Sequence, residues 1–330
     1  MKNQVFKCVL LLGIALLGFG CSNDSDVKGP VKMISELNFG DASASTKTTL
    51  NGYTVKWAST DQIGIMNVND ASSNYRFKIS SGSGNSIATF AAYQKSTTDS
   101  TNFLAPGTYI AYYPYKSTRY TASNPYALTS SEQNYIGSHD YMISDQFTVN
   151  SDGSITSSSG TSTVLLKHLF TLVEVNVKII PTDYYYSAST PVIKLVSADL
   201  VTQSYSDYSY ASTYYFNTDG TPGFTYGIDR VSATPQSNVV LDTGEYQKFN
   251  LFVRQQQTSE NASATPVDIA FEIKFRYSDD DTGEDSYIYT PSFTIASTAI
   301  LAPGDKKVIK FGFNMTGLAQ EDCSLTKMND

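Results

Sequence analysis

The sequence has few of the residue types that build catalytic and metal sites. Its 330 residues include two histidines, three cysteines and one tryptophan, and only 16% of the residues are charged. The short motifs HExxH, GxSxG and the P-loop do not occur, so the chemistries that these motifs support are not indicated. We therefore expect no enzyme activity, no cofactor and no metal centre.

Cysteine is too scarce for a disulfide-dense scaffold, and helical periodicity is almost absent. Alternation of apolar and polar residues is widespread instead, most clearly over residues 267–277 and 171–179. Turn signals such as Asn51-Gly52 and Asp219-Gly220 separate these segments. This pattern predicts an all-β chain of two tandem antiparallel β-sandwich domains, at 31–160 and 161–320, with a polar tail at 321–330. The boundary is placed on the polar stretch 151–163, interpreted as a linker.

No apolar run near the N-terminus is long enough to cross a bilayer, since the segment 9–17 falls short of about 20 residues. Lys2 and Lys7 precede this segment, and small residues lead to Cys21. The arrangement predicts a secretory signal peptide at 1–20. It resembles a bacterial lipoprotein signal, in which the cysteine carries the lipid, although Gly18 stands where leucine is usual. The alternative is ordinary secretion, with Cys21 an incidental residue.

The lipoprotein resemblance implies a location as well as an anchor. Residues 21–30 are expected to form a tether between lipid and fold, and their acidic start resembles the export tag of Bacteroidetes-type surface lipoproteins. Without Lys2 and Lys7 the chain has 21 basic and 31 acidic residues, a net charge near −10. That charge argues against nucleic acid and anionic lipid surfaces as partners. We expect a surface-exposed protein, anchored to the cell outer membrane through Cys21.

Three segments resemble the fimbrillin family of type V pili. The first, 46–65, joins a Thr-Lys-Thr step to a strand ending in Trp57 and then to Asp61-Gln62-Ile63-Gly64. The second, 165–177, has the order His168-Leu169 followed by Val173-Glu174, and the third, weaker segment is 103–114. The resemblance implies two transthyretin-like β-sandwiches and a lipid-anchored subunit. It also implies loss of the first strand to a protease, after which a neighbour's strand fills the vacated groove.

Carried onto this chain, the family's basic cleavage position falls on Lys47. Cutting there would release residues 21–47 together with the strand expected at 31–39. Lysine replaces the arginine that is frequent in the family, which puts an arginine-specific protease in doubt, and a plain lysine in a solvated loop is the alternative. The expected donor strand, 307–315, could equally be the last strand of its own domain, and the polar tail weakens the case for a shaft subunit.

Other candidate sites are weaker. The sequence Ser138-His139-Asp140 could on paper supply a triad, whereas His168 is expected to be structural. The acidic run 279–285 suits calcium by composition but fails the EF-hand spacing, so a solvated hairpin tip is the preferred interpretation. Three adjacent tyrosines could contact a ligand: Tyr184, Tyr185 and Tyr186. Ser100 lies in a short match to a Bacteroidetes-type O-glycosylation motif.

Together these features predict a fimbrillin-like surface lipoprotein, a structural or adhesive component of fimbriae. Its expected partners are other fimbrial subunits, bound by β-strand addition, the outer membrane, and a host protein or glycan. The alternative is a glycan-binding outer-membrane lipoprotein of a nutrient-uptake system, which would use the tyrosines at 184–186. A secreted hydrolase is a further rival, because sequence alone does not exclude a pair of catalytic carboxylates.

Overall fold

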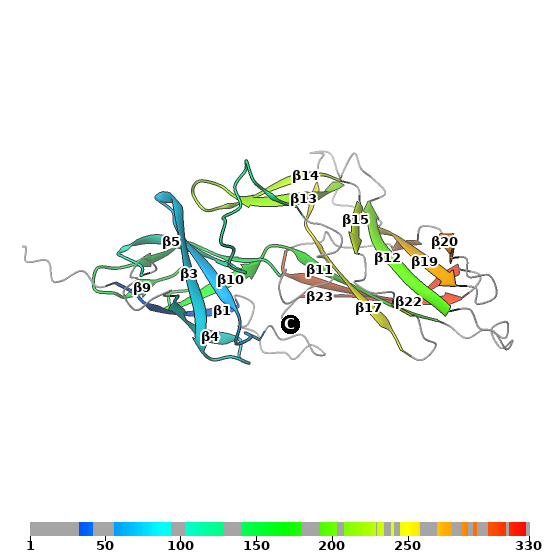
Figure 1. Cartoon of the computed structure of the whole chain (residues 1–330), viewed down its shortest axis with the longest axis horizontal. Helices are drawn as coiled ribbons and strands as arrows, with labels where there is room; N and C mark the ends of the chain where they lie inside the picture. Colours follow the sequence, from blue (N-terminus) through cyan, green and yellow to red (C-terminus); the bar gives the residue numbers. More distant parts are fainter. Residues whose placement is uncertain are drawn as a thin grey trace, which may run out of the picture.

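The computed structural model describes residues 33–41, 56–93, 103–127, 140–179, 192–202, 208–228, 230–233, 239–240, 245–257, 269–278, 285–289, 293–295, 303–314 and 317–327. All regular structure in these ranges is β, in strands labelled β1 to β23 (Figure 1). Within the same ranges there is no helix long and apolar enough to span a bilayer. The prediction of an all-β chain is confirmed.

The first unit is built on one nine-stranded sheet that closes on itself. Its strand order is β2-β3-β4-β1-β10-β7-β5, and β5 pairs again with β2, so seven strands form a barrel-like ring. β8 and β9 extend the sheet from β5. The strands are β1 (Glu36–Asp41), β2 (Gln62–Asn67), β3 (Asp70–Ser81), β4 (Ile87–Ala92), β5 (Gly107–Tyr113), β7 (Met142–Ser144), β8 (Phe147–Val149), β9 (Ile155–Thr156) and β10 (Thr163–His168).

The second unit contains two sheets that remain open. One has the order β17-β11-β22-β23: β17 (Gln247–Val253), β11 (Thr171–Ile179), β22 (Asp305–Asn314) and β23 (Gly317–Lys327). The other has the order β15-β12-β19-β20, with β16 on β12 and β21 on β19: β15 (Arg230–Ala233), β12 (Val192–Thr202), β19 (Ile269–Ser278), β20 (Asp285–Tyr289), β16 (Val239–Val240) and β21 (Phe293–Ile295).

A small sheet joins the two units. It consists of β14 (Pro222–Ile228), β13 (Tyr208–Phe216), β18 (Gln255–Gln257) and β6 (Tyr126–Ala127), and β6 reaches it from the first unit. Beneath it lies a core of side chains from both units, including Tyr112, Tyr141, Phe170, Tyr214 and Phe216. The ring centroids of Tyr141 and Tyr214 are 4.7 Å apart, and those of Tyr112 and Phe216 are 5.0 Å apart. This aromatic seam fixes one unit against the other.

The structure corrects several details of the predicted architecture. The first unit is a closed sheet, not an open sandwich, and the pairs β1–β10 and β11–β22 are parallel. The stretch 151–163 is no linker, because it carries β9 and leads into β10, which belongs to the first sheet. Residues 321–327 lie in β23, not in a tail. Alternation reports which face a residue takes but not which strand pairs with which, and so these features were not predictable from it.

Candidate functional site

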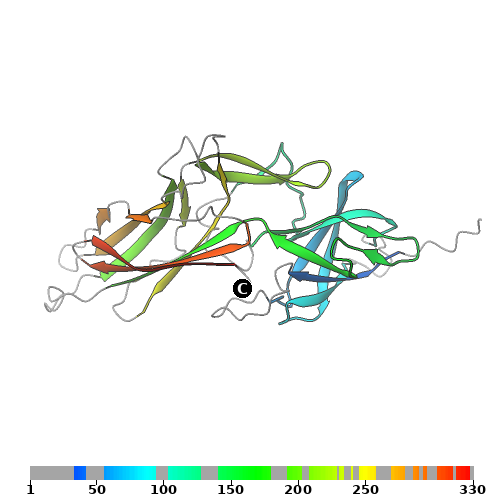
Figure 2. The same ribbon diagram turned by 180° about the vertical axis from the view of Figure 1, so that it is seen from behind.

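The candidate site is strand β1 and the groove that it occupies in the closed sheet. β1 pairs antiparallel with β4, where Leu37 lies opposite Phe90, and parallel with β10, where Phe39 lies opposite Val164. Figure 2, the view from behind, shows β1 (dark blue) beside β10 (green) in the first unit. A strand held between two neighbours has its backbone groups paired on both sides, so its removal would leave two unpaired strand edges at once.

The side chains of β1 form part of the first core. Ile34, Leu37 and Phe39 are all buried, and Phe39 has no exposed surface. The Phe39 ring meets the Phe90 ring edge-on at 5.5 Å, and Trp57 meets the same Phe90 ring at 5.1 Å. Removing β1 would therefore open an apolar slot between β4 and β10, with Phe90 and Trp57 in its floor.

The outer side of β1 is shaped to fit closely between its neighbours. Asn38 accepts a hydrogen bond of 2.9 Å from the Thr89 hydroxyl on β4. A Cβ atom added at Gly40 would stand 3.2 Å from Ile87 and 3.4 Å from Leu165, so the groove is narrow at this point. Just before the strand, Ile34 and Leu104 exchange backbone hydrogen bonds of 2.9 and 3.0 Å.

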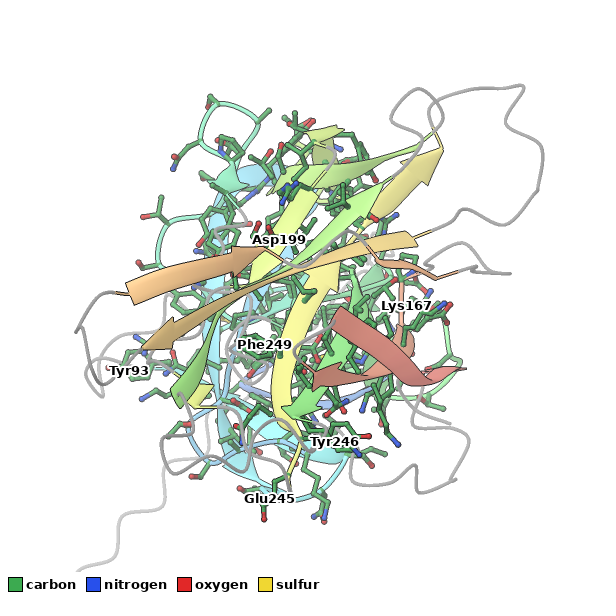
Figure 3. All side chains as sticks on the ribbon, turned by 90° about the vertical axis from the view of Figure 1, so that its right-hand side faces the viewer. Tyr93, Lys167, Asp199, Glu245, Tyr246 and Phe249 are labelled. Carbon is green, nitrogen blue, oxygen red and sulfur yellow. The ribbon has the colours of Figure 1, made fainter. Side chains whose placement is uncertain are left out.

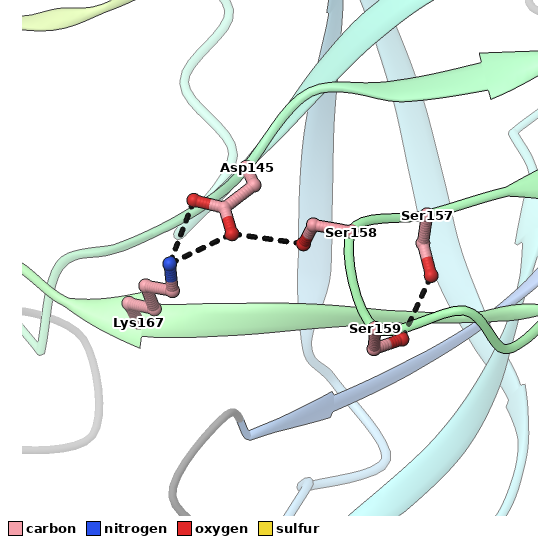
Figure 4. Close-up of polar contacts among 5 residues, drawn as sticks. All are labelled: Asp145, Ser157, Ser158, Ser159 and Lys167. Carbon is pink, nitrogen blue, oxygen red and sulfur yellow. Dashed lines mark hydrogen bonds and ion pairs between the residues drawn. The ribbon is translucent and has the colours of Figure 1, made fainter.

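The β10 wall of the groove pairs with β7 and is tied by polar side chains to the segments that flank β7 and follow β9 (Figure 4). Lys167 Nζ lies 2.7 Å from both carboxylate oxygens of Asp145, and the Ser158 hydroxyl donates to the same carboxylate at 2.8 Å. The hydrogen bonds from Lys167 and Ser158 hold the pKa of Asp145 below its ordinary value. His168 Nδ1, buried at the end of β10, lies 2.6 Å from Asp140 Oδ1.

The segment 57–64 supplies the floor of the groove. Trp57 is buried, and its indole nitrogen donates to the Ser86 carbonyl at 3.1 Å. Asp61 closes the turn after it by accepting from the Ala58 backbone at 2.7 Å, and it also accepts from the Tyr113 hydroxyl at 3.0 Å. Burial raises the pKa of Asp61, and these two hydrogen bonds oppose the rise. The tryptophan and aspartate of the first sequence motif are thus packing and turn residues.

Gly64 of the same motif has no room for a side chain. The ring of Tyr112 lies flat over Gly64, so that a Cβ atom there would come within 2.0 Å of it. The Tyr112 hydroxyl is fixed in turn by donation to Asn74 Oδ1 at 2.7 Å, and the ring packs on Phe216 of the second unit. Gly64 therefore lets the seam between the units approach the first sheet.

Most predicted site residues lie outside the described ranges. These are the lipidation candidate Cys21, the cleavage candidate Lys47, the glycosylation candidate Ser100, the ligand candidates Tyr184, Tyr185 and Tyr186, the triad candidate His139 and the acidic loop at 279–284.

Asp140, a candidate for a triad, contacts His168 at 2.6 Å, which fits the structural role expected for that histidine. Two tyrosines of β13, Tyr210 and Tyr214, are buried and so are not part of an exposed ligand-contacting surface. No cluster of three or more potential metal ligands occurs among the described residues.

The importance of the β1 groove was missed at the level of individual side chains. The sequence predicts a strand at 31–39 and a candidate cleavage position at Lys47, but it gives no sign that β10 forms one wall of the groove. One local feature does mark this strand: the polar pair Lys167 and His168 ends an alternating run. In the structure both side chains contact residues more than twenty positions earlier in the chain.

No protein-family model matches the chain, and no curated protein matches it. Solved structures do. A candidate cell adhesion protein from Bacteroides uniformis has a TM-score of 0.48 and 14% identity, over 89% of this chain and 97% of that one. A fimbrial protein from Bacteroides vulgatus has a TM-score of 0.43 and 12% identity, over 81% and 91%. The C-terminally truncated tip fimbrial protein Mfa3 from Porphyromonas gingivalis has a TM-score of 0.31 and 10% identity, over 88% and 98%.

The names of these neighbours describe fimbrial or candidate cell adhesion proteins. At identities of 10–14% and TM-scores below 0.5, neither a residue nor a role is carried over from them to this chain.

Proposed function

We propose that the chain is a fimbrial or adhesive surface subunit that assembles through the β1 groove. In this proposal it reaches the outer membrane as a lipoprotein anchored at Cys21. Cleavage in the segment that follows β1, at Lys47, then frees β1 together with the anchor. A strand from a neighbouring subunit takes the vacated place and restores the backbone pairing of β4 and β10.

The observation that carries the proposal is the double pairing of β1 near the start of the mature chain. It is the first strand described, it lies between two strands from distant parts of the sequence, and it contributes Leu37 and Phe39 to the core. A terminal strand in this position can leave without breaking any connection between other elements. The groove left behind is specific, because alternate positions demand large apolar side chains and Gly40 demands a small one.

The donor strand predicted at 307–315 corresponds to β22, which is held between β11 and β23, so it is neither an edge strand nor the last strand of its sheet. β23, which follows it, is the better donor, because it lies at the edge of the sheet and pairs with β22 alone among the described strands. An edge strand has fewer backbone hydrogen bonds to give up than an interior strand. A segment containing β23 can therefore exchange partners at lower cost than β1, which supports a subunit that offers a groove at one end and a strand at the other.

The proposal is tested by cutting the mature protein on purpose. A specific protease site replaces residues 45–50, and the cut protein is followed by size-exclusion chromatography and by electrophoresis after mild detergent. We expect monomer before cleavage and, after it, a ladder of bands at multiples of the subunit mass. A synthetic peptide of residues 31–41, added in excess at cleavage, should refill the groove and suppress the ladder.

The matched control carries the same protease site in the turn at 157–161, which lies in the first unit but does not free β1. Cleavage there should give no ladder. Monomer after complete removal of β1, or a ladder insensitive to both the peptide and deletion of residues 317–330, would contradict assembly through this groove.

A further inference from the structure

The outer face of β2 and β3 carries a row in which aromatic and cationic side chains alternate. Arg76 places its guanidinium carbon 4.1 Å from the centre of the Tyr93 ring and 5.3 Å from that of Tyr115. Lys78 Nζ lies 4.6 Å from the centre of the same Tyr93 ring. The order along the row is therefore Tyr115, Arg76, Tyr93, Lys78, and we call these four residues the cation–tyrosine row.

The row faces outward and is accessible. Arg76 and Lys78 alternate on β3 with Phe77, which is fully buried in the first core, so they take the opposite face. All four side chains of the row are partly exposed. Figure 3 shows Tyr93 at the margin of the molecule.

Arg76 is held in a defined orientation. Its Nε donates to the Gln62 side-chain oxygen at 2.8 Å, while the two tyrosine rings lie near its guanidinium group. A partly exposed arginine ordinarily keeps much of its rotamer freedom, and ordering such a side chain costs up to about 2 kcal/mol. Among the described residues, Gln62, Tyr93 and Tyr115 thus all help to order the Arg76 side chain. A guanidinium group whose orientation is already fixed loses less conformational entropy on binding an anion than a guanidinium group on a mobile side chain.

The row also concentrates positive charge in an acidic protein. Arg76 and Lys78 approach the same ring although they repel each other, and the chain as a whole has a net charge of −8. Among the residues that the structure describes, Glu36 is the carboxylate in line with Lys78 on this face, two strands away in the register Lys78–Ala91–Glu36. Cation–π contacts at exposed sites are worth only about 0.5–1 kcal/mol each, so stability alone is a weak reason for this arrangement.

Short side chains lie beside the row. On β4 the outward residues that follow Tyr93 are Ala91 and Thr89, and Asn38 of β1 lies next to Thr89. The strand begins at Ile87, whose exposed side chain bounds this lane of short side chains, which includes one hydroxyl and one amide group. Such a lane suits an extended chain rich in hydroxyl groups, while the tyrosines offer both ring surface and a polar tip.

From these observations we infer that the cation–tyrosine row binds an acidic polysaccharide, with Arg76 and Lys78 contacting carboxylate or sulfate groups on the sugar chain. The ligand lies across the face of β3 and β4, and the two tyrosines contact the sugar rings. The site is complete in the uncleaved monomer and does not depend on strand exchange.

The test measures binding by the full mature chain, uncleaved, in affinity electrophoresis and calorimetry. The probes are polygalacturonate, which carries carboxylates, heparin, which adds sulfates, and neutral dextran. We expect retardation by at least one polyanion and none by dextran. Arg76→Gln should weaken binding about tenfold or more, equivalent to about 1.4 kcal/mol. Arg76→Lys should fall between, because it keeps the charge but loses the planar fork.

The matched control is Lys56→Gln, which removes one positive charge from an exposed lysine of the first unit that belongs neither to the row nor to the groove. It should leave binding unchanged, and melting temperatures will show that each variant is folded. Equal loss in Arg76→Gln and Lys56→Gln would mean a response to overall charge and would overturn the site. Failure of both polyanions to bind would also overturn it, as would equal binding of dextran.

Polyglutamate serves as a last probe. If it binds as tightly as the polysaccharides, with the same dependence on Arg76, an acidic protein is the partner and the assignment to polysaccharide is wrong. Because every measurement uses uncleaved monomer, a negative result leaves assembly through the β1 groove untouched, and a failure of assembly leaves this site untouched.

Discussion

The two units solve the problem of exposed strand edges in opposite ways. In the first unit β5 returns to pair with β2, so the ring of seven strands has no edge of its own. In the second unit both sheets end in strands that have one described neighbour, such as β17 and β23. A closed sheet is guarded against addition of a foreign strand, whereas an open edge invites it.

The proposed assembly uses this difference between the two ends of the chain. β1 is an interior strand, so a foreign strand could enter the first unit only after β1 had left. β23 is an edge strand and could change partners at the cost of one ladder of hydrogen bonds. Under the proposal, a subunit would stay monomeric until it is cut, because the acceptor groove is closed while the donor strand lies at an edge.

The largest expected effect comes from truncating the core side chain of β1. Phe39→Ala should lower the free energy of unfolding by about 3–5 kcal/mol, because Phe39 has no exposed surface and packs on Phe90. Phe249→Ala in β17 removes an equally buried ring, labelled in Figure 3, from an edge strand of the second unit. We expect a smaller loss there, because an edge strand can shift to fill the cavity.

Denaturant titration can follow the two units by different signals. Trp57 is the only tryptophan of the chain and lies in the first core, so its fluorescence reports the first unit. Circular dichroism reports both. If Phe249→Ala lowers the free energy of unfolding as much as Phe39→Ala or more, the edge strand of the open sheet does not adjust to a cavity better than the closed sheet does.

The next effect is overpacking at Gly64. Gly64→Ala should cost up to about 3 kcal/mol, because the new methyl group would overlap the Tyr112 ring, which is fixed by Asn74 and Phe216. Gly107→Ala on β5 is the matched control, since a Cβ atom there would meet its nearest neighbour at 3.4 Å. In a Tyr112→Ala background the Gly64→Ala loss should largely disappear. A persisting loss would place the strain in the backbone.

The two units also differ in how their stability depends on pH, and this effect is of intermediate size. Burial raises the pKa of Glu174 on β11, but hydrogen bonds from Asn176, Lys306 and Lys248 outweigh it and hold the pKa below its ordinary value of 4.5. A depressed pKa contributes stability above that value, and the contribution is lost as the pH falls through the folded-state pKa. Asp61 in the first unit has a raised pKa and so has the opposite sign.

Glu174→Gln should therefore lower the free energy of unfolding by about 1–3 kcal/mol at pH 7, and the difference from wild type should close below pH 4. Asp61→Asn removes a carboxylate whose ionisation opposes folding, so its effect should become less favourable as the pH falls. Unfolding free energies measured between pH 3 and 7 check both signs. Parallel curves for wild type and Glu174→Gln would show that the ion pairs with the two lysines contribute nothing.

The sequence alone predicts the local elements well. The alternating run at 171–179 is strand β11, and the run at 267–277 matches β19 within two residues. The strand expected at 31–39 contains the start of β1, with Leu37 and Phe39 on the buried face as the alternation requires. These successes share a cause, because alternation directly reflects one wet and one buried face.

Pairing between distant strands was beyond this kind of reasoning. Nothing local in β1 specifies β10, which lies more than 120 residues away in register. The composition of the serine-rich stretch 151–163 predicts a linker, yet its hydroxyl groups form hydrogen bonds within one turn, as in the 2.8 Å contact between Ser157 and Ser159. Tyrosine was equally ambiguous, since Tyr214 is buried in the seam whereas Tyr93 is partly exposed.

The smallest expected effect compares one buried tyrosine from each unit. The Tyr113 hydroxyl donates to Asp61, whereas the buried Tyr210 hydroxyl has no hydrogen-bond partner among the described contacts. Tyr113→Phe should cost about 1 kcal/mol, because it removes a hydrogen bond to a carboxylate, and Tyr210→Phe should be neutral or slightly stabilising. Thermal melts of the two variants are sufficient to measure this. If Tyr210→Phe is the more damaging change, its hydroxyl has a partner such as bound water, and the second core is more polar than its side chains suggest.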